Sequence, residues 1–335
     1  MAVAKNGNPA IIQKQTNTNM KVIILESEST KKDLLKFGSD LLNKVKETCS
    51  TIIYDKVSED FSNIPELKDN EEKILLYNPY CIDGDFSHLT KHLPTFKNVK
   101  YLFSPYSYYT DLDLELLRKM GIKYRNNAGA NAKSVAQLAI TVMFMLLSRV
   151  PQLGYENKEP SGEILGEELD NKTIGIIGMG NVGKTLADKF KKLGIPSVFY
   201  NRTAKEMGIS QVDLEEVFNQ DIVFLTIAKN EETAEMLKNI FSLIKKHQYL
   251  IDISAYDDFY DKHKMIEMLK NNSLTGYAFE TSNPQNYRTS DKLNLVITPH
   301  MAWSTLDAES NVARHYLNRT LKVLGGKVDD IDFIV

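Results

Sequence analysis

The residues that most clearly indicate a chemistry lie between Thr173 and Gly183, in the run TIGIIGMGNVG. An apolar stretch leads into Gly178, and apolar residues at helical spacing follow Gly183. The first glycine permits a tight turn, Gly180 lets backbone approach a phosphate, and the third lets the helix pack close to the strand. The N-terminus of that helix would add free N–H groups and a positive dipole end. The run therefore predicts a site for linked phosphate groups.

Two phosphate-binding patterns fit this run. The dinucleotide pattern G-x-G-x-x-G needs Gly180, whereas the nucleoside-triphosphate pattern G-x4-G-K-[ST] needs Lys184 and Thr185, with Gly180 incidental. Polar residues follow the next expected strand about 20 positions later, where a dinucleotide fold meets the ribose, which favours the dinucleotide. Lys184 and Thr185 can equally be ordinary residues of the first helical turn. The expected phosphate contacts are Gly178, Gly180, Asn181, Val182 and Gly183.

The end of that next strand, Tyr200-Asn201-Arg202-Thr203, indicates which dinucleotide is bound. In NAD-binding folds an Asp or Glu here accepts a hydrogen bond from the ribose 2′-hydroxyl. Asn201 carries no charge that would repel a 2′-phosphate, and Arg202 and Thr203 could bind one. NADP is therefore favoured over NAD, although Arg202 could instead stack on the adenine of either cofactor.

The elements that must position these residues alternate between strand and helix. This alternation predicts an α/β fold with doubly wound parallel sheets. Helices are expected over 31–47, 112–120, 131–149 and 306–324, with Gly121 and Gly325 as stop signals, and a surface loop over 151–171. Strands are expected at 21–25, 51–54, 73–77, 98–103, 173–177, 198–200, 222–226, 250–253, 276–279 and 295–298.

Composition limits the classes of function. A chain of 335 residues suggests two domains, and 42% apolar with 25% charged residues is typical of a globular protein. The net charge of −3 and the lack of a long basic run argue against nucleic acid or an anionic membrane as partner. The longest apolar stretch, Leu138 to Leu147, is too short to span a bilayer.

Cysteines and histidines indicate neither a disulfide framework nor a metal site. The two cysteines, Cys49 and Cys81, form no CxxC motif, and the six histidines show no HExxH-like spacing. Residues 1–19 are polar and lack the apolar core of a signal peptide, so they are expected to form a disordered tail. A cytoplasmic protein is expected.

From about residue 20 to residue 326 the chain resembles the D-isomer-specific 2-hydroxyacid dehydrogenases. Residues 126–150 (NNAGANAKSVAQLAITVMFMLLSRV) are similar to the family's inter-domain helix and its lead-in. Residues 166–183 are similar to the approach to the glycine loop, and 221–233 (DIVFLTIAKNEET) to the strand and turn that pass under the cofactor. Residues 293–305 (LNLVITPHMAWST) are similar to the segment with the catalytic histidine.

The resemblance implies a Rossmann NAD(P)-binding domain, residues 126–305, inserted into a flavodoxin-like substrate domain, residues 20–125 plus 306–335. It also implies a homodimer joined through the cofactor domain. The implied reaction is hydride transfer between nicotinamide C4 and C2 of a 2-oxo or 2-hydroxy acid, a small-molecule substrate. Beyond the glycine loop and the 201–203 turn, the implied cofactor contacts are Thr226, Ala228, Ile253, Glu280 and His300, with Glu280 near the nicotinamide carboxamide.

The family's catalytic groups are only partly present. His300 follows an expected strand end and matches the family's general acid/base. The family's arginine falls on Ala255, or on Tyr256 if one residue is inserted, and neither can form a charged fork on a carboxylate. The glutamate that pairs with the histidine falls near Asn283 or Gln285. The carboxylate loop, where the family has glycines, reads SPYSYY over 104–109, and Trp303 replaces a small residue.

Two functions remain open. In the first, the protein is an active reductase of a 2-oxo acid or related carbonyl compound. His300 donates the proton, Tyr256 helps to orient the carbonyl, and Arg125 or Arg288 replaces the missing anchor. In the second, the protein is a catalytically degenerate NAD(P)-binding sensor or interaction module. A triphosphate-binding protein is a distant third hypothesis.

Overall fold

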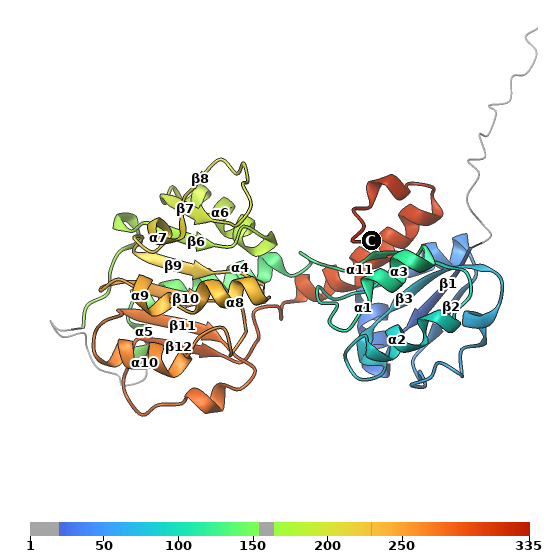
Figure 1. Ribbon diagram of the computed structural model, residues 1–335, viewed down its shortest axis with the longest axis horizontal. Helices are drawn as coiled ribbons and strands as arrows, with labels where there is room; N and C mark the ends of the chain where they lie inside the picture. The colour runs from blue at the N-terminus through green and yellow to red at the C-terminus, as the bar shows by residue number, and fades with distance from the viewer. Residues whose placement is uncertain (1–19, 154–163, 229) are drawn as a thin grey trace, which may run out of the picture. The chain divides into compact units, whose positions relative to one another are not determined.

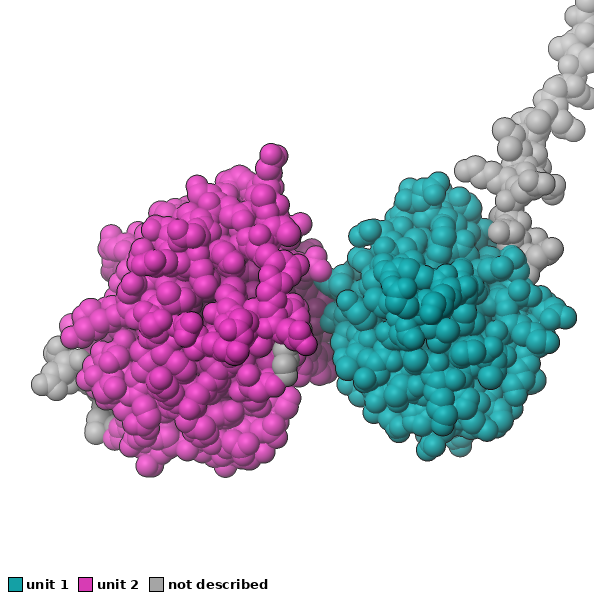
Figure 2. Space-filling model, viewed as in Figure 1, with its two compact units in different colours: residues 1–130, 309–335 teal, residues 131–308 magenta. Residues whose placement is uncertain are grey.

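The computed structural model describes residues 20–153, 164–228 and 230–335, so the tail expected for residues 1–19 lies outside the described residues. The chain divides into two compact units, which we call unit 1 (Met1–Ala130 with Glu309–Val335) and unit 2 (Asn131–Ala308; Figure 2). Unit 2 is inserted between the two segments of unit 1. The divisions fall after Ala130 and Ala308, a few residues beyond the boundaries at 125 and 305 expected from the sequence.

Unit 1 contains one parallel sheet, of which Figure 1 labels β1, β2 and β3, and its strand order is β2-β1-β3-β4-β5. This is the flavodoxin-like order 2-1-3-4-5. Its strands are β1 (Met20–Leu25), β2 (Thr51–Tyr54), β3 (Glu72–Tyr77), β4 (Val99–Phe103) and β5 (Lys123–Arg125). Its helices are α1 (Glu28–Thr48), α2 (Ser87–His92), α3 (Leu114–Met120), all but the first three residues of α11 (Leu306–Leu324) and the 3-10 turns Pro65–Lys68, Pro79–Cys81, Leu93–Thr95 and Val328–Asp330.

Local sequence explains most of these elements. The apolar run of β1 is buried because helices cover both faces of the sheet, with Ile24 facing one apolar cluster and Ile23 the other. Ser27 begins α1 through a capping box with Thr30. Gly121 ends α3 with φ +68, the left-handed conformation that the sequence predicted there.

Unit 2 contains a second parallel sheet with the order β12-β11-β10-β9-β6-β7-β8. If β6 is counted as strand 1 and the order is read from β8, the strands follow the Rossmann order 3-2-1-4-5-6, with β12 as one further strand. This order confirms the predicted fold class. Its strands are β6 (Ile174–Ile177), β7 (Ser197–Tyr200), β8 (Ser210–Gln211), β9 (Ile222–Leu225), β10 (Tyr249–Asp252), β11 (Gly276–Glu280) and β12 (Leu295–Thr298). Its helices are α4 (Ala132–Leu147), α5 (Val150–Leu153), α6 (Asn181–Leu193), α7 (Leu214–Val217), α8 (Glu231–Leu237), α9 (Ile240–Leu243), α10 (Lys262–Lys270) and the 3-10 turns Leu169–Asn171 and Pro284–Tyr287.

The strand order also identifies the edge where ligands bind in such sheets. The order reverses between β6 and β9, and the carboxyl ends of the strands at this switch point line the ligand crevice of open parallel sheets. The glycine run directly follows β6. The predicted phosphate site therefore lies at the place where this topology puts a dinucleotide.

Some short elements were not predicted. β5 and β8 have three and two residues, too few to show a periodic pattern. The surface loop expected over 151–171 is wrong at its start, because α5 covers Val150–Leu153, and its residues 154–163 lie outside the described residues. Arg149 interrupts the preceding helix with φ +56, and Pro151 is tolerated in a first helical turn. Within the described ranges, no helix has the length and hydropathy needed to cross a bilayer.

Candidate functional site

The three glycines after β6 are needed for different reasons. Gly178 has φ +98, and an added Cβ would lie 2.7 Å from Ile227. A Cβ on Gly183 would lie 2.0 Å from the carbonyl oxygen of Gly178, so the helix could not pack as it does. A Cβ on Gly180 would meet no protein atom within 4 Å. Packing therefore explains the first and third glycines, and open space at a helix N-terminus, which fits a phosphate, explains the second.

The start of α6 decides between the two phosphate patterns. The helix begins at Asn181, only three residues after Gly178. Lys184 and Thr185 are therefore helical residues, and the Thr185 hydroxyl donates a hydrogen bond to the carbonyl of Asn181 at 2.8 Å. A triphosphate loop needs a longer non-helical segment that wraps the phosphates before its Lys. The geometry favours the dinucleotide pattern.

Three of the expected cofactor residues follow β9 and β10 at the same edge of the sheet. The Thr226 hydroxyl donates to the carbonyl oxygen of Gly178 at 2.7 Å, so this side chain holds the glycine turn in place. Ala228 is exposed, and its carbonyl accepts from the Thr233 hydroxyl at 2.9 Å. Ile253 is almost fully buried directly after β10. Their contacts with a cofactor stay predictions.

The turn after β7 is fixed to the glycine turn through Asn201. Its side-chain oxygen accepts from the backbone N–H of Met179 at 3.0 Å, and its side-chain N–H donates to the carbonyl of Thr203 at 2.8 Å. Gln211 of β8 donates to the carbonyl of Asn201 at 2.7 Å and accepts from the N–H of Lys205 at 2.9 Å. The residues expected near the ribose therefore form one ordered turn.

This turn carries two cations, of which the sequence analysis identified one. Arg202 is exposed and pairs with Glu232 of α8, which is also exposed, so the pair is easily exchanged for another anion. Lys205 was missed, although it lies only three residues further along the same polar turn. Its ammonium donates to the carbonyl oxygen of Met179 at 2.7 Å. Lys205 thus reaches the phosphate-binding turn itself.

His300 lies just after β12 in a strained turn. The residue is exposed and has φ +45, unusual for a side chain other than glycine. Glu280, at the end of β11, is 2% exposed, and one of its oxygens accepts from the N–H groups of Met301 and Ala302 at 2.6 and 2.8 Å. Burial raises the pKa of Glu280, although these hydrogen bonds and the charge of His300 oppose the rise. The carboxylate therefore holds the turn that presents His300.

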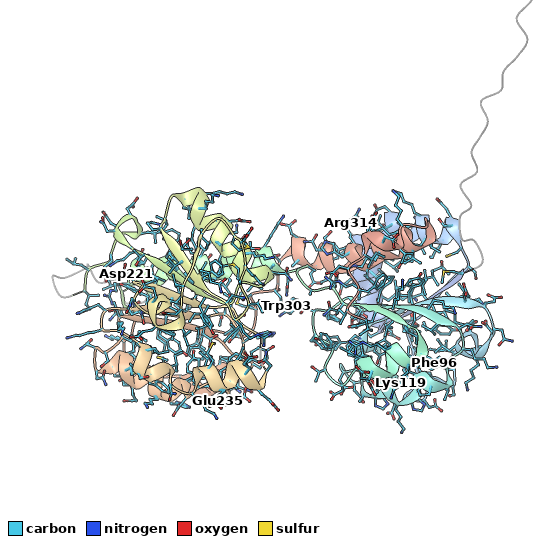
Figure 3. All side chains as sticks on the ribbon, turned by 45° about the horizontal axis from the view of Figure 1, so that its top comes forward. Phe96, Lys119, Asp221, Glu235, Trp303 and Arg314 are labelled. Atoms are coloured by element: carbon cyan, nitrogen blue, oxygen red, sulfur yellow. The ribbon has the colours of Figure 1, made fainter. Side chains whose placement is uncertain are left out.

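Trp303 makes a further hydrogen bond within the same turn. Its indole N–H donates to the carbonyl oxygen of His300 at 2.9 Å. The Trp303 side chain, labelled in Figure 3, belongs to a residue that is 41% exposed.

In residues 20–153, 164–228 and 230–335, no group of three or more His, Cys, Asp or Glu side chains could hold a metal ion.

The loop after β10 has no cation where the family places its arginine. Ala255 has φ +63, and Tyr256 is 36% exposed with its ring packed edge-on against Phe259 at 5.1 Å. Asp257 accepts from the Thr281 hydroxyl at 2.9 Å through one oxygen, and its other oxygen is buried without a hydrogen-bond partner. This loop therefore offers hydrogen-bond acceptors rather than a positive charge.

A buried ion pair that the sequence analysis missed fixes both ends of this loop. Asp252 and Lys262 are completely buried, with 2.7 Å between carboxylate and ammonium. Tyr260 donates to the same carboxylate at 2.7 Å, and the N–H of Ser254 donates to its other oxygen at 2.9 Å. Burial alone would raise the pKa of Asp252, but the charge and hydrogen bond of Lys262 hold it below its ordinary value. The only sequence signal was an aspartate inside the apolar strand YLID.

The two arginines expected as substitute anchors belong to different units. Arg125 ends β5 in unit 1, and Arg288 is an exposed residue of unit 2. The aromatic loop over 104–109 is in unit 1, where the carbonyl of Tyr106 accepts from the N–H of Asn127 at 2.8 Å. Tyr106 also packs edge-on against Tyr80 at 5.2 Å.

Comparison with known proteins places this site in a family. Residues 140–302 match the model of the D-isomer specific 2-hydroxyacid dehydrogenase NAD binding domain. Unit 2 therefore contains an NAD binding domain of the D-isomer-specific 2-hydroxyacid dehydrogenase type. The glycine turn, the turn after β7 and the His300 turn all lie within or next to the matched residues. The family assignment supports NAD-dependent oxidoreduction on CH–OH groups and a nicotinamide cofactor.

Individual members of the family are distant relatives. A glyoxylate reductase from Thermococcus litoralis is 25% identical over 310 residues, 86% of this chain and 84% of the relative. A hydroxypyruvate reductase from Thermotoga maritima is 27% identical over 241 residues, 68% of this chain and 79% of the relative. The NAD-complexed D-isomer specific 2-hydroxyacid dehydrogenase from Lactobacillus delbrueckii ssp. bulgaricus has a TM-score of 0.71 at 19% identity, covering 92% of this chain and 97% of that one.

Proposed function

We propose that this protein is an NADP(H)-dependent reductase that interconverts a 2-oxo acid, or a related carbonyl compound, and its 2-hydroxy counterpart. The observation that carries the proposal is the open space beside Gly180 at the start of α6, next to a turn that bears Arg202 and Lys205. The relatives named glyoxylate reductase and hydroxypyruvate reductase make those two 2-oxo acids the first substrates to test.

The residues present fit a nicotinamide dinucleotide phosphate. The backbone N–H groups at the start of α6 would hold the linked phosphates, since they point out of a helix N-terminus into open space. Asn201, Arg202, Thr203 and Lys205 would hold a 2′-phosphate, because residues 201–205 include two cations and no carboxylate. Thr226 would act indirectly, by holding the glycine turn.

The chemistry requires a proton donor at the carbonyl oxygen. When bound, the reduced nicotinamide supplies a hydride to the carbonyl carbon. The protonated imidazole of His300 gives its proton to the carbonyl oxygen, which turns C=O into CH–OH and leaves a neutral imidazole. Glu280 keeps this imidazole in place through the backbone of Met301 and Ala302. The hydroxyl of Tyr256, a residue that is 36% exposed, would help to orient the carbonyl.

The proposal extends to the location, oligomeric state and partners of the protein. We expect a cytoplasmic homodimer joined through unit 2, with a small-molecule substrate and neither nucleic acid nor membrane as partner. Phe144 on α4 is 44% exposed and offers an apolar contact for a second copy.

A second function is favoured by the loop after β10. Because that loop carries Ala255 and Tyr256 in place of an arginine, the protein could bind NADP(H) without turning over a 2-oxo acid. It would then act as a cofactor-dependent sensor or interaction protein.

The test combines cofactor binding with turnover. Oxidation of NADPH and NADH is followed with glyoxylate, hydroxypyruvate, pyruvate and aldehydes, in the wild type and His300→Ala. The reductase hypothesis predicts turnover that falls about 10²- to 10⁴-fold in His300→Ala. Gly180→Ala should keep its fold and bind NADPH at least about tenfold more weakly, a loss of 1.4 kcal/mol. Tight NADPH binding without turnover supports the sensor, and binding of ATP alone contradicts both.

A further inference from the structure

Unit 1 contains a group of basic side chains to which the proposed reaction assigns no step. Arg125 ends β5, and His315 and Arg319 lie one turn apart on α11. The guanidinium of Arg319 donates to the side-chain oxygen of Asn127, two residues after Arg125, at 2.9 Å. We call Arg125, His315 and Arg319 the basic cluster.

In the basic cluster, Arg319 lacks an anionic partner among the described residues and Arg125 has only a distant, exposed one. Across the described ranges of the chain, Arg319 has no carboxylate within ion-pair distance. The carboxylate paired with Arg125 belongs to Asp332, at 3.8 Å and on a side chain that is 93% exposed. Arg314, on the same helix (Figure 3), shows the ordinary arrangement, because both of its terminal nitrogens bind the carboxylate of Asp40, at 2.6 and 3.0 Å.

Within the basic cluster, Arg319 is coupled unfavourably to both Arg125 and His315. Burial, and then the charge of Arg125, lower the pKa of Arg319 to about 10. Burial and the charge of Arg319 likewise lower the pKa of His315. Like charges held together and partly removed from water are unfavourable unless an anion joins them.

Two hydrogen bonds to neighbouring backbone fix Asn127, whose side-chain oxygen is the neutral acceptor for Arg319. The side-chain N–H of Asn127 donates to the carbonyl of Val312 at 3.1 Å, and its backbone N–H donates to Tyr106 at 2.8 Å. The side-chain oxygen of Asn127 is therefore turned toward Arg319. A single amide oxygen satisfies one donor of a guanidinium that has five.

We propose that the basic cluster is a binding site for a small oxyanion, a carboxylate or phosphate group, held by the guanidinium groups of Arg319 and Arg125. A planar guanidinium group can donate two parallel hydrogen bonds to a pair of oxygens on either a carboxylate or a phosphate. The geometry therefore suits both kinds of anion. All of its residues belong to unit 1, so the site does not depend on the proposed reductase activity.

The test is thermal unfolding of the full-length protein without cofactor, in sodium chloride, acetate or phosphate at equal ionic strength. Acetate, phosphate or both should raise Tm by at least about 3 °C over chloride in the wild type. This increment should disappear in Arg319→Gln, which keeps a donor to Asn127 but loses the charge. It should persist in Arg314→Gln, the matched control, which removes the same charge from the same helix.

Each outcome is decisive. A rise confined to acetate identifies a carboxylate site, and a rise confined to phosphate identifies a phosphate site. No rise with either anion, or equal rises in the wild type and Arg319→Gln, overturns the proposal, because excluded-salt effects act on every variant alike. If Arg319→Gln does not fold, Arg125→Gln replaces it. Turnover is not measured, so failure of the reductase hypothesis leaves the result intact.

Discussion

At the scale of single residues, Glu280 is a buried acid whose role is set by two backbone N–H groups. Glu280→Ala would leave the N–H groups of Met301 and Ala302 without their acceptor, at a cost to the free energy of unfolding of about 2 kcal/mol. Glu280→Gln keeps an acceptor oxygen and should lose less than about 1 kcal/mol. Urea unfolding of the three proteins checks this. Equal losses in the two variants would show that the charge, rather than the acceptor, stabilises the turn.

Glu26, which follows β1, is a second buried acid and makes stability depend on pH. It is 1% exposed and accepts from Asn78 at 2.6 Å and Tyr316 at 2.7 Å, yet burial raises its pKa above the ordinary 4.5. The native state therefore binds this proton more tightly than the unfolded state. Stability contributed by Glu26 is gained as pH falls through the raised pKa toward 4.5, and at higher pH the buried charge is a net cost.

Glu26→Gln removes that charge and should therefore increase the free energy of unfolding most at high pH. We expect the free energy of unfolding of Glu26→Gln, minus that of the wild type, to be more positive at pH 8 than at pH 5. Denaturant titrations of both proteins at the two pH values measure the difference. Any fixed cost of the rearranged hydrogen bonds cancels in this comparison, so an equal difference at both pH values would refute the assignment.

At the scale of elements, the turn after β7 is an ordered unit that joins β8 to the glycine turn. Lys205 donates to the carbonyl of Met179 within this unit, and we expect it to contact the 2′-phosphate of NADP(H). Lys205→Gln should weaken NADPH binding about tenfold while NADH binding changes less than about twofold. Fluorescence titration with both cofactors measures the two affinities.

The control for Lys205 is Lys238→Gln. Lys238 is an exposed lysine of the same domain and pairs with Glu235, which Figure 3 labels. This variant should change neither affinity. If Lys205→Gln weakens NADH and NADPH equally, Lys205 acts by shaping the glycine turn and does not read the 2′-phosphate.

At the scale of the whole molecule, the open prediction is the homodimer. Phe144→Asp places a charge on the exposed apolar position of α4, and desolvating that charge in an interface is unfavourable, so the variant should sediment as a monomer. Leu35→Asp on α1 is the matched control, since Leu35 is 43% exposed and Phe144 44%. Sedimentation equilibrium of both variants measures the state. A wild type that is monomeric, or a Phe144→Asp variant that stays dimeric, removes the proposed interface.

Features that depend on neighbours in the chain could be predicted from the sequence. The glycine turn, the capping and stopping of helices, and the apolar strands all follow from residues within one turn or one strand of each other. The alternation of strand and helix then predicted both parallel sheets, because a parallel strand needs a crossover. Gly121 and Gly178 show why this works, since a left-handed φ favours glycine wherever it occurs.

Contacts between distant residues were decided only by the tertiary structure. Asn127 and Arg319 are 192 positions apart, and nothing in either segment indicates that they meet. The same holds for Glu280 and the turn after His300, where the carboxylate binds backbone that every residue possesses. The sequence by itself therefore determined the elements and the phosphate turn. Packing decided which polar groups are buried and paired, because burial depends on side chains brought together from remote parts of the chain.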